Sequence, residues 1–332
     1  MNLWSYGFEI SIGLISSMLI ISAIILSLGI AVRNKRLQEF GKEEINQSFI
    51  NSIILGLMAG LFGPKGASYP LLSSLIPSNF SYACPYSIEN SLSCFAYDYL
   101  IGSGYLIGNT AFPSLVSILT PLLLSLYALN AAIGLLAGIR IAGVISLSQA
   151  FSPLLSSLQY IIKTLNIAEI SVMIQGSLIV FTSTVSISLL MPLGLMLRSF
   201  YPSRKLGGFL TALSIGLYAV LPLSYILNAL VISSYTSSSP ISQVDSVTQS
   251  VNGGIPYSVS SNSIIIGTLL SPINYIISEV NTLISSLESF LGYVFLATIV
   301  LPVFSLTLTG ISVRELSALL GSEPYFDIFE MI

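Results

Sequence analysis

Long apolar runs, separated by short polar or charged segments, fill most of this 332-residue sequence. The runs lack the residue-by-residue alternation of barrel strands. Most approach the ~20 residues that a helix needs to cross about 30 Å of hydrocarbon. The pattern predicts an all-α, polytopic transmembrane helical bundle with about seven spans, in one integral membrane domain over residues 1–332. The predicted spans cover residues 10–32, 45–62, 110–139, 141–162, 170–197, 206–232 and 290–311.

Composition argues against a soluble enzyme. Hydrophobic residues make up 54% of the chain and charged residues 8%, whereas a soluble domain carries about 25% charged residues. The sequence contains no histidine, which excludes imidazole chemistry. It also shows no phosphate-binding Gly loop with its Lys, no metal-ligand cluster and no nucleophile with a base. We therefore expect no catalytic residue, no cofactor and no metal ion.

The cations predict the orientation in the cell membrane, because Lys and Arg gather on the cytoplasmic side. If the chain crosses the membrane at the predicted spans, nine cations lie on the cytoplasmic side, and two, Lys65 and Lys163, lie on the outer side. The N-terminus is then outside and the C-terminus cytoplasmic. The predicted inner cations are Arg33, Lys35, Arg36, Lys42, Arg140, Arg198, Arg204, Lys205 and Arg314.

The segment 141–162 decides this orientation although it is only moderately apolar and contains Gln149 and Pro153. If it crosses, the cations at residues 198–205 return to the inside, and if it does not, they face outward against the charge bias. We count it as a span, and a full crossing and a kinked or re-entrant course both stay open.

Two outer regions are predicted, at residues 63–108 and 233–289. The first contains Cys84 and Cys94, the two cysteines of the chain, and an even pair outside the cytoplasm favours a disulfide. Such a bond would contribute roughly 2–3 kcal/mol. The alternatives are two free thiols or a metal pair that lacks further ligands. The second region predicts a Ser-rich loop followed by an interfacial helix over about 264–289.

Small residues four positions apart predict helix packing. Gly56 with Gly60, and Gly134 with Gly138, form such pairs, which let a neighbouring helix approach closely. We expect neighbouring copies of the chain to meet through them.

The most distinctive segment runs from Leu190 through Gly208. A helix kinked at Pro192 is predicted to reach the cytoplasmic face, where a basic turn with Arg198, Arg204 and Lys205 precedes a span that starts with Gly207 and Gly208. One interpretation is a tight helical hairpin anchored by snorkelling cations. The other is a turn that docks a cytoplasmic partner such as an ATPase.

This segment carries a family resemblance. The runs 192–198, 204–208 and 212–218, followed by Pro222, resemble the core of TrbL-type inner-membrane channel subunits of conjugation and type IV secretion systems. They are most similar to the CedA-like proteins of the DNA-import system of Crenarchaeota, which are archaea. The resemblance covers about thirty residues and implies a membrane subunit at the base of a DNA-transfer pilus. Its implied partners are a cytoplasmic hexameric ATPase and small pilin-like membrane subunits, with DNA as a possible cargo.

Two other functions stay open. Pro-interrupted helices are also typical of small-solute membrane transporters, and a structural membrane anchor of a pilus or other surface complex would need no conduit. A tight grip on DNA requires many Lys and Arg, and the predicted spans carry no basic stripe. The residues by themselves therefore do not show whether the chain contacts DNA.

Overall fold

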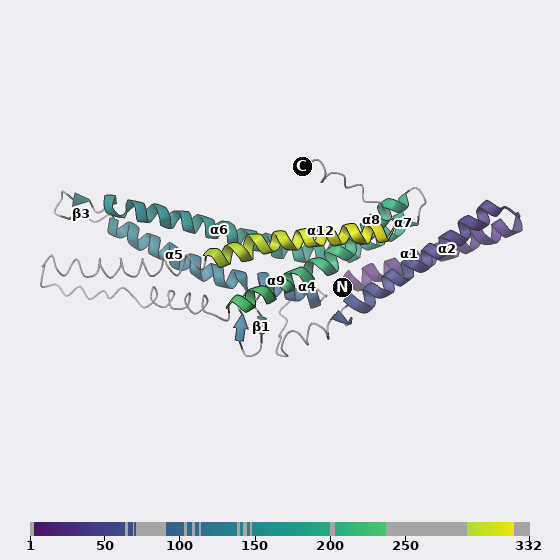
Figure 1. Cartoon of the computed structure of the whole chain (residues 1–332), viewed down its shortest axis with the longest axis horizontal. Coiled ribbons are helices and arrows are strands. Elements are labelled where there is room, and N and C mark those ends of the chain that lie inside the picture. Colours follow the sequence, from purple (N-terminus) through teal and green to yellow (C-terminus); the bar gives the residue numbers. More distant parts are fainter. Residues whose placement is uncertain are drawn as a thin grey trace. The chain divides into compact units, whose positions relative to one another are not determined.

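The computed structural model of the chain is helical, with two very short β-hairpins (Figure 1). It divides into two compact units. Unit 1 comprises residues 1–114, 175–229 and 303–332, and unit 2 comprises residues 115–174 and 230–302. The residues that the structure describes are 3–63, 66–68, 70, 91–102, 105–107, 110–112, 114–137, 140–141, 145–146, 148–199, 203–236 and 291–321.

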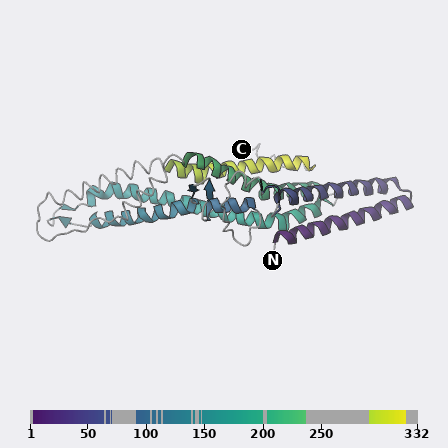
Figure 2. The ribbon, with the colours of Figure 1, turned by 90° about the horizontal axis from the view of Figure 1, so that it is seen from below.

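Helices α1 (Leu3–Ala31) and α2 (Lys35–Phe62) form a hairpin in unit 1, and they lie side by side in Figures 1 and 2. Asn34 caps α2, because its side-chain oxygen accepts a hydrogen bond of 3.0 Å from the backbone N–H of Arg36. The two helices pack so closely that a Cβ at Gly41 would lie within 3 Å of α1 backbone atoms.

The buried face of α2 changes character along its length. Its buried residues recur every three or four positions, as expected for one helix face. The first half of this face is polar and the second half is apolar. The face consists of Gly41, Glu44, Ser48, Asn51, Leu55 and Met58. Leu55 and Met58 join a core cluster with Ile187, Met191 and Tyr218, so the polar half lies toward the α1–α2 turn.

The longest helix, α6 (Ser148–Val185), continues through the π-helical segment η1 (Ser186–Leu190) into α7 (Met191–Arg198). The predicted end of one span at residue 162 and start of another at 170 are therefore wrong, since the helix runs through both positions. Its candidate membrane-spanning part, Leu155–Arg198, has 44 residues. At 1.5 Å per residue this part is roughly 66 Å long, about twice the hydrocarbon thickness of a bilayer.

In unit 2, helix α5 (Leu115–Ala137) runs antiparallel to the first half of α6. The strands β3 (Arg140–Ile141) and β4 (Ile145–Ser146) pair between the two helices. Two cross-helix hydrogen bonds fix the register. Thr120 Oγ1 donates to Glu169 Oε1 at 2.8 Å, and Asn166 Nδ2 donates to Tyr127 Oη at 2.6 Å.

The remaining long helices also contain π-helical segments. Helix α8 (Arg204–Ile215) continues through η3 (Gly216–Val220) into α9 (Leu221–Thr236). A helix from residue 291 passes through η4 (Leu296–Val300) into α12 (Leu301–Leu319). In unit 1 the short helix α4 (Ser91–Leu100) is largely buried, and the strands β1 (Tyr105–Ile107) and β2 (Thr110–Phe112) follow it as a hairpin.

Each of the three π-helical segments in the described part of the chain ends two positions before a proline. In each, the backbone N–H directly before the proline bonds to the carbonyl five residues earlier, as Met191 does to Ser186. A proline has no N–H and its ring clashes with the carbonyl four residues back. The widened turn relieves that clash while the helix continues. The prolines are Pro192, Pro222 and Pro302.

Five helices among the described residues are long and apolar enough to cross a membrane. The prediction of a helical chain with several helices able to span a membrane is thus confirmed, whereas the crossing itself and the number of spans stay predictions. The predicted spans 10–32, 45–62, 206–232 and 290–311 each largely coincide with one of these helices. The third predicted span begins too early, because Thr110–Phe112 form a strand. Most of the region 233–289 lies outside the described residues.

Candidate functional site

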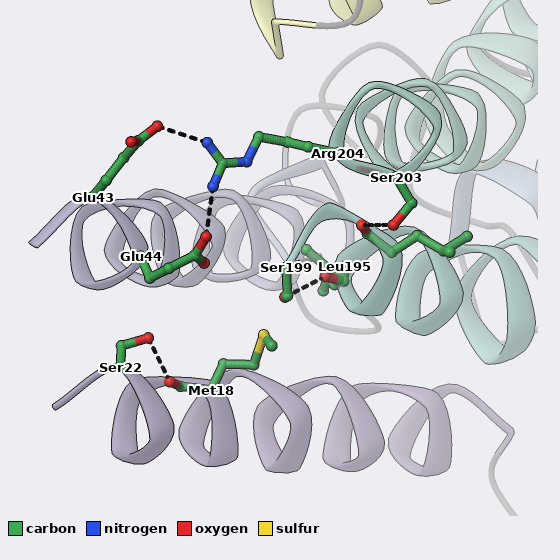
Figure 3. Close-up of polar contacts among 9 residues, drawn as sticks. Met18, Ser22, Glu43, Glu44, Leu195, Ser199, Ser203 and Arg204 are labelled. Carbon is green, nitrogen blue, oxygen red and sulfur yellow. Dashed lines mark hydrogen bonds and ion pairs between the residues drawn. The ribbon is translucent and has the colours of Figure 1, made fainter. Parts of the chain in front are cut away.

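An ion-pair cluster joins the two helical hairpins of unit 1 (Figure 3). Arg204, the first residue of α8, places Nη1 2.7 Å from Glu43 Oε1 and Nη2 2.6 Å from Glu44 Oε1. Glu43 is exposed, but the Glu44 side chain is only 8% exposed and belongs to the buried face of α2. One guanidinium therefore holds together helices that start about 170 residues apart in the chain.

The two pairs differ in their energetic weight. An exposed pair such as Arg204–Glu43 contributes at most about 1 kcal/mol, because water screens it. Removing the partner of a buried carboxylate such as Glu44 costs about 3 kcal/mol or more, since the charge then stays buried without compensation. The Arg204–Glu44 pair is thus the contact that fixes α8 against α2.

Arg198 ends α7 and lies on the other side of the same turn. It is 4% exposed, and its Nε and Nη1 form no hydrogen bond with any described residue. Among the described residues, Arg204 is a cation close enough to repel it. A buried cation without an acceptor is unfavourable by several kcal/mol.

Serine hydroxyls at the two described ends of the turn, Ser199 and Ser203, bond to carbonyls of α7. Ser199 Oγ donates to the carbonyl of Leu195, and Ser203 Oγ donates to the carbonyl of Leu197, both at 2.8 Å (Figure 3). A Cβ at Gly207 would collide with the backbone N and Cα of Arg198. This contact requires glycine at position 207.

The same close approach continues one turn further along both helices. A Cβ at Gly194 would lie 2.7 Å from Thr211 Oγ1 and 2.8 Å from its backbone N. The helices α7 and α8 therefore touch backbone to backbone over this stretch, where Gly207 and Gly208 are both buried.

The three cations of the predicted basic turn thus have different surroundings in the structure. Arg198 is buried, Arg204 is bound to two carboxylates, and Lys205 is exposed. The docking interpretation stays a prediction, and Lys205 is the member of the three whose side chain faces outward. Pro192 is the second residue of α7, directly after η1.

The other predicted site residues lie apart from this turn. Among the described residues, no atom beyond the glycine's own stretch of helix lies within 4 Å of a Cβ built at Gly56, Gly60 or Gly134. Their predicted role in contacts between copies stays a prediction. Gly138 and Cys84 lie outside the described residues, while Cys94 is buried on α4. The disulfide is therefore still a prediction.

The sequence interpretation missed Glu43, Glu44 and Asp98. The two glutamates stand between a basic turn and an apolar run, which is a common boundary pattern, and their partner is 160 residues away. Asp98 is 2% exposed on α4, and Gly102 leaves the space that its carboxylate occupies. A lone acid within an otherwise apolar and aromatic segment was the available signal.

The described residues hold no group of three or more metal-ligating side chains. The ion-pair cluster of Arg204, Glu43 and Glu44 holds α2 and α8 together. The chain matches no protein-family model, no curated protein and no solved structure.

Proposed function

We propose that this chain is a non-enzymatic, multi-pass subunit of the cell membrane that serves as platform or conduit of an archaeal DNA-import machine of the conjugation type. The supporting observation is that the residues carrying the family resemblance form the best-packed part of the bundle. The helix Arg204–Ile232 is the most buried of the five candidate spans, and it packs against α7 through Gly194 and Gly207. The proposed partners are a hexameric ATPase on the cytoplasmic side and small pilin-like membrane subunits.

The topology in this proposal has five spans rather than seven. If α5 crossed the membrane inward, the single long helix from Ser148 to Arg198 would end outside, against the charge bias. With α5 and the first part of α6 on the outer side, the same helix ends inside. The N-terminus is again outside and the C-terminus inside. Eight cations then lie inside, and Lys65, Arg140 and Lys163 lie outside.

The exposed face of α6 supports this topology. From Ser152 to Thr164 its exposed residues are mostly Ser, Gln, Lys and Thr, apart from Pro153 and Tyr160. From Ile167 onward it becomes apolar, with Ile170 and Ile174 more than half exposed. The apolar face continues to Met196, a length of roughly 44 Å. That length matches a bilayer of about 40–45 Å with its headgroups, so the polar part of α6 extends into water outside.

The labelling of introduced cysteines tests this topology. We expect a cysteine at Ser146 or Ser157 to react with a membrane-impermeant maleimide in intact cells, because both positions lie in the outer part of unit 2. A cysteine at Lys35 should react only after permeabilisation. The seven-span alternative places residues near 140 inside, so protection of Ser146→Cys in intact cells would refute the five-span topology.

The polar interior of unit 1 favours a conduit between copies over one through a single chain. Asn228 Nδ2 donates to Ser305 Oγ at 2.7 Å, and Tyr225 Oη donates to Gln175 Oε1 at 3.4 Å. These buried groups bond to one another across helices. DNA would then pass along surfaces shared by several copies, for which Gly56, Gly60 and Gly134 are available.

Gene deletion tests the function. The gene is deleted in either the donor or the recipient strain, and exchange of a chromosomal marker is scored between cells. We expect transfer to be lost only when the recipient lacks the gene, and restored by the wild-type gene. Normal transfer in that cross would exclude the DNA-import function.

A small-solute transporter is the second candidate, and the three proline-linked π-helical segments favour it. Such segments often occur at functional sites, and transporters place Pro-interrupted helices at their binding sites. Unaltered marker exchange, together with a growth defect on a defined solute, would put this function first.

A further inference from the structure

The two helices of the first hairpin, α1 and α2, have apolar parts of different length. Residues 23–32, at the end of α1, contain no charged residue, whereas residues 35–44 of α2 contain six. A Cβ at Gly41 would lie 2.8 Å from the backbone N of Leu26, which fixes the register of the pair. The charged start of α2 therefore lies beside the uncharged end of α1.

The neighbouring helix α8 begins at the level where this charged part ends. Arg204, the first residue of α8, contacts Glu44 (Figure 3). Further along, Tyr218 Oη donates a hydrogen bond of 3.4 Å to the carbonyl of Phe62. The segment from α8 into η3 thus runs beside α2 from Glu44 to Phe62, a length of about 27 Å that is close to the roughly 30 Å of hydrocarbon in a bilayer. Residues 23–32 then extend about 15 Å past the hydrocarbon.

This projecting end of the hairpin has two unlike faces. On the α1 side, Ile24, Leu28 and Val32 are 52%, 54% and 68% exposed. An upright hairpin would leave these side chains in water, which is unfavourable by about 25 cal/mol for each Å² of apolar surface. The exposed residues of α2 at the same level include Lys35, Arg36, Glu39 and Lys42.

We propose that the projecting end lies on the surface of an anionic membrane, with residues 23–32 among the headgroups and Arg33, Lys35 and Arg36 at the lipid phosphates. A helical element with one apolar face and one basic face lies in the membrane interface in this way. A helix whose apolar part is longer than the hydrocarbon is thick tilts. A tilt toward α1 brings residues 23–32 to the headgroups and leaves the charged face of α2 in water. On the proposed topology this surface is the inner leaflet, and the inference is independent of any role in DNA import.

The charges favour a lipid surface over a second copy of the chain as the partner. The projecting end carries four exposed cations, while one of its two exposed carboxylates, Glu43, already pairs with Arg204. Its net charge is therefore positive and matches the negative surface potential of a membrane with anionic lipids. The same end of a second copy would bring like charges together, which opposes that contact.

Tryptophan fluorescence of the full-length chain in lipid nanodiscs tests the proposal. The chain contains one tryptophan, Trp4, so a Trp4→Phe background reports an introduced tryptophan alone. Leu28→Trp places the reporter on the apolar face, and Glu39→Trp is the matched control at the same level on the charged face. Brominated lipids quench from within the membrane and acrylamide quenches from water. Both sides of a nanodisc are accessible, so the result does not depend on the orientation of the chain.

We expect brominated lipid to quench Leu28→Trp strongly and acrylamide to quench it weakly, and the reverse for Glu39→Trp. Brominated phosphatidylglycerol should associate with the Leu28→Trp site more tightly than brominated phosphatidylcholine. Lys35→Gln and Arg36→Gln should each weaken that preference by about fivefold, because each removes one cation from the anionic surface. Arg314→Gln, which removes an exposed cation of α12, should leave the preference unchanged.

Three results would overturn the proposal. Acrylamide quenching of Leu28→Trp as strong as that of Glu39→Trp would show that the projecting end stands in water. Quenching of Leu28→Trp by neither agent would show that protein, such as a second copy, covers it. Equal association of the two brominated lipids would refute binding to anionic headgroups. If Leu28→Trp does not fold, Val32→Trp carries the same test at a more exposed position.

Discussion

Two basic turns of this chain look equivalent in sequence and differ in structure. The first turn, residues 32–34 between α1 and α2, contains Arg33 and is followed by Lys35 and Arg36. All three cations are exposed. The second turn, between α7 and α8, is flanked by Arg198, which is buried, and Arg204, which is bound to Glu43 and Glu44. The charge bias depends only on which side a cation occupies. It therefore cannot distinguish a cation that faces water from one that is buried or that holds two helices together.

Replacing the cation that follows each turn should give the largest difference. We expect Arg204→Gln to lower the free energy of unfolding by about 3 kcal/mol, because Glu44 would remain buried without a partner. Arg36→Gln, the matched change at the first turn, should stay within about 0.5 kcal/mol of the wild type. Unfolding by SDS titration in mixed micelles measures both.

A double substitution separates this ion pair from other effects of losing Arg204. Adding Glu44→Gln to Arg204→Gln should recover part of the loss, since no charge is then left buried. Equal stabilities for Arg204→Gln and Arg36→Gln would show that the two turns do not differ in this way.

Glycine substitutions test how closely each hairpin is packed. A Cβ at Gly207 would overlap the backbone of Arg198, which cannot move aside as a side chain could. We expect Gly207→Ala to cost about 2–3 kcal/mol. Gly41→Ala in the first hairpin should cost less, because its nearest contact, Leu26 N, is 2.8 Å away. Gly60→Ala meets nothing within 4 Å and should stabilise the helix by about 0.5–1 kcal/mol. A Gly207→Ala variant as stable as Gly60→Ala would contradict the packing.

The sequence predicted the elements that depend on local pattern. The second turn was predicted between residues 197 and 206, and α7 ends at Arg198 while α8 begins at Arg204. The break at residues 163–169 was wrong. Lys163 was predicted to lie outside the membrane between two spans, yet no Pro or Gly interrupts the helix there, and Glu169 in the same stretch accepts a hydrogen bond from Thr120.

The features that the sequence could not predict are mostly contacts between residues far apart in the chain. The pairing of Arg204 with Glu44 and that of Thr120 with Glu169 join residues far apart in the chain. One sequence without relatives gives no signal for such pairs. The proline-linked π-helical segments could not be foreseen either, since Pro192 was expected to kink its helix, and whether a widened turn absorbs the clash depends on the packing around it.

The smallest expected change in stability concerns the residue that directly precedes the second helix of each hairpin, Asn34 before α2 and Ser203 before α8. Asn34 accepts a hydrogen bond from the backbone of α2, whereas Ser203 donates one to the carbonyl of Leu197. Replacing either with Ala should cost about 1 kcal/mol. Conservative changes distinguish the two roles. Asn34→Asp keeps the acceptor and Ser203→Thr keeps the donor, so both should retain wild-type stability in the same SDS titration.

A different result for Ser203 would change the account of the second turn. If Ser203→Ala were as stable as the wild type, the hydroxyl would not be holding Leu197, and the first turn of α8 would rely on its other contacts. If both Ala variants lose about 1 kcal/mol, the two turns reach similar local stability by opposite means. The first turn satisfies the N-terminus of its helix from within the chain. The second turn uses its serine to hold the end of the preceding helix instead.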